Sequence, residues 1–219
     1  MLYKINMILL YVIIIIYISY ILMYDKKYNL YNYVIGNGKH IYRYKDILKI
    51  ASNGDIILLS GYSFCENVIK YITESIFSHV CMIIKEDNEL YIWESDIGQR
   101  YKNGPRIIKI SDKLNYYSGY KVGLLRILPD NIRKPTHKEI LAIADNNIYK
   151  SMNFNVFKWI FSYLYDTNNS SLFCSELVAI TLKHLHILTD KRLSHSYSPG
   201  SWYGNDDVCT HVGEYWFYF

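Results

Sequence analysis

Hydrophobic residues in this chain form one long run near the N-terminus and several short runs farther along. The long run, Met7 to Tyr24, contains no charged residue and is followed by Asp25, Lys26 and Lys27. At about 1.5 Å per residue, a helix over this run would measure roughly 27 Å, enough to cross the hydrocarbon core of a bilayer. Since no small-x-small cleavage signal follows it, the pattern predicts a membrane anchor over residues 1–27, inserted through 7–24.

The charges beside this anchor favour a cytosolic C-terminal domain. Two lysines follow the apolar run, whereas Lys4 and the amino terminus precede it. Glycosylation acceptor patterns begin at Asn168 and Asn169, and a glycan there would obstruct access to Cys174. We therefore expect a single-pass protein of a viral or host membrane with its folded part in the cytosol.

The shorter runs predict one folded domain over residues 51–219. A polar, tyrosine-rich connector over 28–50 precedes it and ends in a short helix near 44–51. Strands are expected at 55–60, 79–84, 89–95 and 120–128. Helices are expected after capping boxes at Ser63 and Thr136, over 155–165, and from Cys174 onward, while the tail from 197 to 219 is interpreted as loop with an edge strand. Strands interspersed with helices in this way indicate an α+β domain.

Composition and charge exclude several classes of partner. The chain has 24 Lys and Arg residues and 20 Asp and Glu residues, so it is only mildly basic. No run of basic residues is long enough to follow a phosphate backbone, and no nucleic acid partner is therefore expected. The four cysteines, Cys65, Cys81, Cys174 and Cys209, show neither CxxC spacing nor a nearby HxxxH pattern. We expect free thiols in a reducing compartment, with no metal and no cofactor.

Cys174, within "SLFCSELVAITLKHL", is the candidate nucleophile. Ser171 is a suitable N-cap, which would place Cys174 in the first helical turn, where free backbone N–H groups stabilise a thiolate. The alternative is a buried structural cysteine, since free cysteine is among the most buried residue types. Cys65 also lies in a predicted first turn, but no base follows it in the right order.

His79 is the candidate base, because an acid lies across from it on the next strand. If residues 85–88 form a four-residue loop, His79 lies opposite Glu94. If the loop has two residues, Asp96 lies opposite His79 and Glu94 becomes the diagonal neighbour. Either register supplies the orienting acid that a Cys–His pair requires.

These motifs, in this order, resemble the circularly permuted branch of the NlpC-type papain-like superfamily. The matching segments are "GDIILL", "SHVCMII", "YIWESDIGQ" and "FCSELVA", and "SPGSW" is similar to a proline-bearing segment of that branch. The branch includes YiiX-type hydrolases, relatives of lecithin:retinol acyltransferase, and poxviral and giant-virus members. Over roughly residues 51–203, the resemblance implies an antiparallel sheet packed by helices, with Cys174 as nucleophile, His79 as base and Glu94 as orienting residue.

The resemblance implies a cysteine hydrolase or acyltransferase that forms a thioester on Cys174. Its substrate would be an amide or an ester, including a lipid ester near the bilayer. No side chain is assigned to stabilise the oxyanion, for which the backbone N–H of Cys174 is the candidate. The alternatives are a catalytically inactive binding module of the same fold and a purely structural membrane protein.

Overall fold

A computed structural model describes Tyr17, Val34 and residues 36–96, 103–116, 122–145, 173–203 and 212–218. Within this part of the chain, a seven-stranded sheet has the order β1-β7-β6-β2-β3-β4-β5. The strands are β1 (Ile41–Arg43), β2 (Ile56–Leu59), β3 (His79–Glu86), β4 (Glu89–Asp96), β5 (Gly104–Lys109), β6 (Val122–Ile127) and β7 (Val212–Tyr218).

Neighbouring strands are antiparallel except for β1 and β7, which run parallel. The prediction of an α+β fold is therefore confirmed, whereas the expected antiparallel sheet is in fact mixed at the β1 edge.

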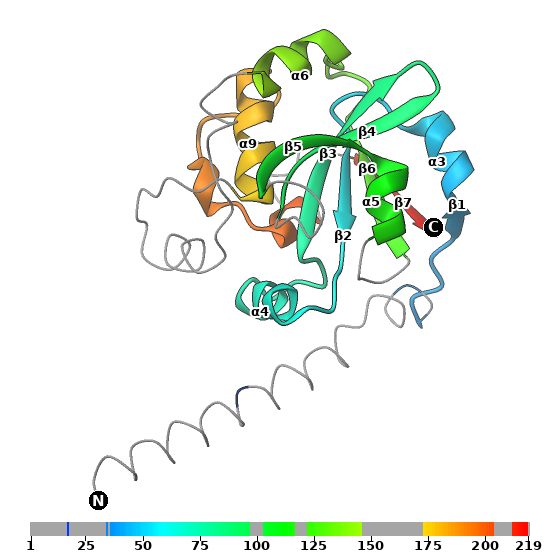
Figure 1. Ribbon diagram of the computed structural model, residues 1–219, viewed down its shortest axis with the longest axis vertical. Coiled ribbons are helices and arrows are strands. Elements are labelled where there is room, and N and C mark those ends of the chain that lie inside the picture. The colour runs from blue at the N-terminus through cyan, green and yellow to red at the C-terminus, as the bar shows by residue number, and fades with distance from the viewer. Residues whose placement is uncertain are drawn as a thin grey trace, which may run out of the picture.

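Helices cover both faces of this sheet (Figure 1). They are α3 (Tyr44–Ile50), α4 (Phe64–Ile72), α5 (Ile110–Tyr116), α6 (His137–Ala144) and α9 (Cys174–His184), with 3₁₀ turns η1 (Ser194–Ser196) and η2 (Pro199–Trp202). α6 and α9 pack over one apolar cluster, and α3 and α5 pack over the other. Because both faces are covered, β2 is apolar without interruption: Ile56 and Leu58 enter the first cluster, and Ile57 and Leu59 enter the second.

Local signals located most of the described elements correctly. The Ser63 and Thr136 side chains each accept a hydrogen bond from a backbone N–H three residues later, and Glu66 and Glu139 complete both capping boxes. β2, β3, β4 and β6 lie within two residues of the expected strand bounds. The helix expected near 44–51 is α3.

Five features differ from the predictions. The N-cap of α9 is Phe173 rather than Ser171. β7 lies between β1 and β6, not at an edge of the sheet. β1 and the consecutive elements β5 and α5 were not predicted from the sequence.

Two predicted segments lie outside the described residues. These are the helix over 155–165 and, apart from Tyr17, the anchor over 7–24. Among the residues that the structure does describe, no helix combines the length and apolar character needed to cross a membrane.

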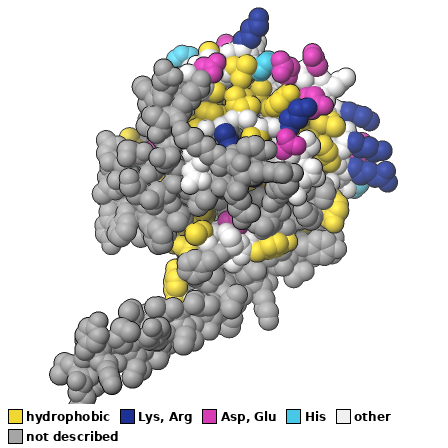
Figure 2. All heavy atoms as spheres, viewed as in Figure 1, with side chains coloured by type: hydrophobic (Ala, Val, Ile, Leu, Met, Phe, Trp, Pro, Cys, Tyr) yellow, Lys and Arg dark blue, Asp and Glu magenta, His cyan; other side chains and the backbone are white. Residues whose placement is uncertain are grey.

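Charged side chains are spread unevenly over the visible surface. Figure 2 shows Lys and Arg side chains gathered at the rim of the described surface near α3, with acidic side chains interspersed elsewhere and an apolar area toward α6.

Candidate active site

Cys174 occupies the first position of α9 and is 4% exposed. Phe173 precedes it in an extended conformation, and the Phe173 carbonyl accepts the first helical hydrogen bond, from the Leu177 N–H. The side chain of Glu176 accepts a hydrogen bond from the Phe173 N–H, so this contact at the helix start is made by a glutamate and not by the expected serine. Cys174 therefore lies in the first helical turn, as the sequence predicts, although a different residue caps the helix.

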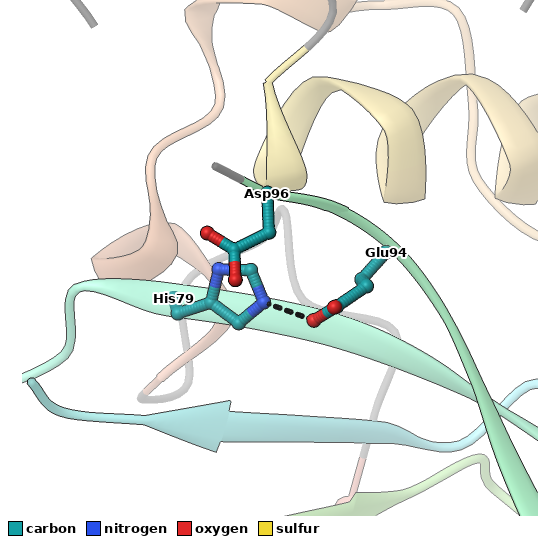
Figure 3. A group of neighbouring side chains, drawn as sticks. All are labelled: His79, Glu94 and Asp96. Carbon is teal, nitrogen blue, oxygen red and sulfur yellow. Dashed lines mark hydrogen bonds and ion pairs between the residues drawn. The ribbon is translucent and has the colours of Figure 1, made fainter. Parts of the chain in front are cut away.

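A two-residue turn between β3 and β4 sets the register that brings His79 to Glu94. Glu86 pairs with Glu89 and Met82 pairs with Trp93, which leaves Asp87 and Asn88 as the turn. Continued toward His79, this register places Asp96 opposite it and Glu94 diagonally, as in the second of the two predicted arrangements. The longer Glu94 side chain nevertheless makes the contact: His79 Nε2 donates to Glu94 Oε2 over 2.8 Å (Figure 3).

The second nitrogen of the His79 ring is available to Cys174. Burial and the Lys113 charge lower the pKa of His79, but the charge and hydrogen bond of Cys174, together with the hydrogen bond to Glu94, raise it to about 10. Glu94 occupies Nε2, which leaves Nδ1 as the ring nitrogen for the thiol. The structure thus brings Cys174, His79 and Glu94 together from α9, β3 and β4.

Glu94 is fully buried and surrounded by positive groups. Arg106 donates to Glu94 Oε1 through Nε over 2.9 Å and through Nη2 over 2.7 Å, and the Lys113 ammonium lies 3.0 Å from Oε2. Burial raises the pKa of Glu94, but Lys113, His79 and Arg106 more than offset this effect and hold it well below its usual range. Glu94 is therefore a carboxylate, which can stabilise an imidazolium.

Asp96 contacts the two cations that hold Glu94. Arg106 Nη2 donates to Asp96 Oδ2 over 3.2 Å, and Lys113 donates to the same oxygen. Sequence reasoning did not identify Arg106 or Lys113. The apolar spacing of Ile110 and Leu114 indicates a helix, with Lys113 beside its buried positions, but only the pairing of β5 with β4 places Arg106 opposite Glu94.

His79, Glu94 and Asp96 also form a cluster with the geometry of a metal site. One donor atom from each lies within 4.8 Å of the others. Glu94 and Asp96, however, already bind Arg106 and Lys113, so the cluster has little net negative charge to hold a divalent cation. The donor set therefore does not fit a resident metal.

The other described cysteines lack the environment of Cys174. Burial, and then Glu66, raise the pKa of Cys65; burial raises the pKa of Cys81 well above its usual range. Cys81, two residues after His79 on β3, is fully buried, and its thiol donates to the Ile57 carbonyl over 3.7 Å. All three described cysteines are free thiols.

The segment that contains η2 connects the two halves of the site. The Ser175 hydroxyl, next to Cys174, donates to the Tyr197 carbonyl over 2.7 Å. Farther along, a Cβ on Gly200 would lie 2.7 Å from the Ser75 Cβ, just upstream of His79. This segment therefore touches both the start of α9 and the approach to β3.

No protein-family model and no curated protein matches the chain. Among solved structures, the chain is similar to the crystal structure of the metalloprotein yiiX from Escherichia coli O157:H7, with a TM-score of 0.45 and 18% sequence identity. The match covers 60% of this chain and 64% of yiiX, so the chain spans less than two thirds of that protein.

Proposed function

We propose that the chain is a cysteine hydrolase or acyltransferase that forms a thioester on Cys174. The observation that carries this proposal is the position of His79, between the Glu94 carboxylate and the Cys174 thiol in a site closed to bulk water. An imidazole held in this way can ionise the thiol, because the carboxylate stabilises the imidazolium that results. The motif resemblance described above points to the same chemistry.

In the proposed reaction, His79 Nδ1 takes the thiol proton and Cys174 Sγ attacks the acyl carbon. A C–S bond forms, the bond to the leaving nitrogen or oxygen breaks, and the imidazolium gives its proton to the leaving group. Water or another acceptor, deprotonated by His79, then attacks the thioester and releases the thiol. Glu94 holds the imidazole in the tautomer that leaves Nδ1 facing the sulfur.

The helix start supplies a donor for the oxyanion. Cys174 is the first residue of α9, so its backbone N–H has no carbonyl one turn earlier within the helix. An oxyanion formed at the acyl carbon beside Sγ would lie close to this N–H, which together with the helix dipole would stabilise it.

Acyl trapping on Cys174 tests this proposal. The full chain is incubated with a panel of activated peptide esters and short-chain phospholipids, and the intact mass is recorded. We expect an acyl adduct that disappears in Cys174→Ala, accumulates little in His79→Ala, and persists in Cys65→Ala, a matched control that removes another first-turn cysteine. Adducts that persist in Cys174→Ala would contradict the proposal.

An inactive binding module of the same fold is the competing proposal. The observation that favours it is the burial of Cys174 and His79, which are 4% and 5% exposed, because a substrate must reach the sulfur. Such a module would bind a ligand without forming an adduct, and its affinity for the ligand would not change in Cys174→Ser. The absence of any adduct with the whole panel, together with binding that Cys174→Ser retains, would favour the module.

A further inference from the structure

The Glu94 carboxylate has all of its hydrogen-bonding positions directed to positive or ionisable donors. Arg106 holds Oε1 through two nitrogens, and Lys113 and His79 share Oε2. The Glu94 side chain is fully buried, and those of Lys113 and Arg106 are 6% and 12% exposed. Such a buried carboxylate keeps its charge because cations compensate for the lost hydration.

We infer that Lys113 and Arg106 are positioning residues of this site, which hold Glu94 as a carboxylate that faces His79. They reach it from two separate elements, α5 and β5, so the carboxylate is fixed from two directions. The inference rests on the proposed function in taking Cys174 and His79 as the reactive pair.

Asp96 completes the arrangement by balancing charge. It accepts from both Lys113 and Arg106, so two carboxylates face two cations. Transfer of a proton from Cys174 to His79 conserves net charge, so the buried cluster stays balanced when the thiolate and the imidazolium form. Both cations bind Asp96 through Oδ2, whereas His79 donates to Glu94.

Lys113 also acts on the reactive pair through its charge. Its ammonium lowers the pKa of His79, which Cys174 and Glu94 raise, and a nearby cation favours a thiolate. Removal of this charge should therefore raise the pH at which the imidazolium loses its proton and make a Cys174 thiolate less favourable. Among the described residues, the titratable and charged groups around His79 come from β3, β4, β5, α5 and α9. They are Cys81, Glu94, Asp96, Arg106, Lys113 and Cys174.

The pH dependence of Cys174 alkylation tests the inference without a substrate. The full chain is treated with iodoacetamide from pH 4.5 to 9, and the rate at each cysteine is read by peptide mass spectrometry. We expect the rate at wild-type Cys174 to fall less than the rate at Cys65 as the pH is lowered from 9 to 6, because His79 can take the Cys174 proton. In Lys113→Met the pH profile of the Cys174 alkylation rate should move to higher pH by at least about one unit. At the low-pH end of the profile, the rate should then be roughly 10-fold lower than in the wild type.

Two further variants separate charge from packing. Lys113→Arg keeps the cation and should leave the profile near that of the wild type. Lys109→Met removes a lysine from the neighbouring β5, where it pairs with Glu89 over 3.2 Å at the surface, and should leave the profile unchanged. If Lys113→Met does not fold, Arg106→Lys, which cannot donate twice to Oε1, should move the profile in the same direction.

The outcomes distinguish the inference from the proposed function. An unmoved profile in Lys113→Met, or an equal displacement in Lys109→Met, would overturn the inference while leaving the reactive pair intact. If Lys113→Met does not fold, an unmoved profile in Arg106→Lys would overturn it as well. A wild-type Cys174 rate that depends on pH in the same way as the Cys65 rate would overturn the proposed function and, with it, the inference.

Discussion

Glu94 and Asp96 are two residues apart on β4 and chemically alike, yet of the two it is Glu94 that contacts His79. The strand register places Asp96 opposite the imidazole. The Glu94 side chain, which is one methylene longer than that of Asp96, nevertheless reaches His79 from the diagonal position. Asp96 instead accepts from Lys113 and Arg106 and is 28% exposed. The two acids therefore have different roles at the residue scale, one toward the imidazole and one toward its supporting cations.

The first prediction compares isosteric neutral variants of these two acids. Glu94→Gln should slow acyl transfer on the order of 10²-fold or more, because an amide cannot stabilise the imidazolium. Asp96→Asn should cost roughly 10-fold or less, because its effect passes through Lys113. The thioester formation rate on Cys174, followed by stopped-flow or quench and mass spectrometry, gives both values. Equal losses, or a larger loss in Asp96→Asn, would assign the orienting role to Asp96.

The residues that could be found from the sequence are those with a local signal. Cys174 follows a helix-start pattern, and His79 and Glu94 lie on neighbouring strands joined by a short turn. Their catalytic roles remain predictions, but their proximity follows from short-range patterns. Arg106 and Lys113 have no such signal, because a charged residue on a short amphipathic segment usually faces water.

At the element scale, the start of α9 is fixed to β3 by the segment around η2. Ser175 donates to Tyr197, and Gly200 packs against Ser75 with no room for a methyl group. The Ser75 hydroxyl in turn accepts from the Phe77 N–H over 3.0 Å, next to the beginning of β3. Any displacement of this segment should therefore change the separation of Cys174 and His79.

The second prediction is that Gly200→Ala both destabilises the fold and loosens the reactive pair. A Cβ there would lie 2.7 Å from the Ser75 Cβ, so one backbone must move, at a cost of about 1–3 kcal/mol in unfolding free energy. Chemical denaturation measures this cost, and Cys174 alkylation at pH 6 should slow as well.

Two variants control the Gly200→Ala experiment. Gly36→Ala makes the same change at a glycine with open space around it and should be nearly neutral. Ser75→Gly, combined with Gly200→Ala, removes the clashing carbon and should restore part of the loss as a favourable coupling energy. Additive effects in that double mutant would show that the clash is not the cause.

Helix ends illustrate how far element-scale prediction from sequence extends. Ser63 and Thr136 each have a glutamate three residues later, and both capping boxes exist. Ser171 lacks such a partner at position 174, whereas Phe173 has Glu176, whose side chain accepts the Phe173 N–H. The correct start of α9 follows from the glutamate rather than from the preference for serine at N-caps.

At the scale of the whole molecule, the sheet is assembled from distant parts of the chain. β7, at the C-terminal end, lies between β1 and β6, and the pairing of β1 with β7 brings residues 41–43 beside 216–218. A pattern of alternating side chains identifies a strand but not its partner, so this interior position could not be predicted. The polar connector likewise gave no indication that its end joins the sheet.

The third prediction concerns stability between pH 6.5 and 8.5. The pKa of His79 is raised from 6.5 to about 10, so its contribution to stability is complete below pH 6.5 and declines as the pH rises toward 10. Over this range the unfolded state loses the His79 proton while the folded state keeps it, which costs about 2 kcal/mol when Cys174 carries the same number of protons in both states. The midpoint temperature of thermal unfolding of the wild type should accordingly fall by several degrees from pH 6.5 to 8.5.

A variant without the imidazole provides the comparison for this pH dependence. His79→Gln should begin less stable, because Glu94 loses a donor that can carry charge, but its stability should change less over the same range. The pKa of Cys81 is also raised, and this effect lowers stability mainly above about pH 8.5, which is why the comparison stops there. Parallel curves for the two proteins would contradict the assignment of the pH dependence to His79.

The fourth prediction concerns attachment of the whole molecule to a membrane through residues 7–24. A double variant with Ile14→Arg and Ile15→Arg should be released from membranes on alkaline carbonate extraction, because each arginine costs about 2.5–3.5 kcal/mol at the centre of an inserted helix. Asn29→Arg and Asn32→Arg add the same charge outside the apolar run and should leave the protein in the pellet. The Cys174 alkylation profile should be unchanged in both variants, since the described groups that act on the pKa of His79 come from β4, α5 and α9. Wild-type protein that extracts fully at alkaline pH would show that the apolar run is not a membrane anchor.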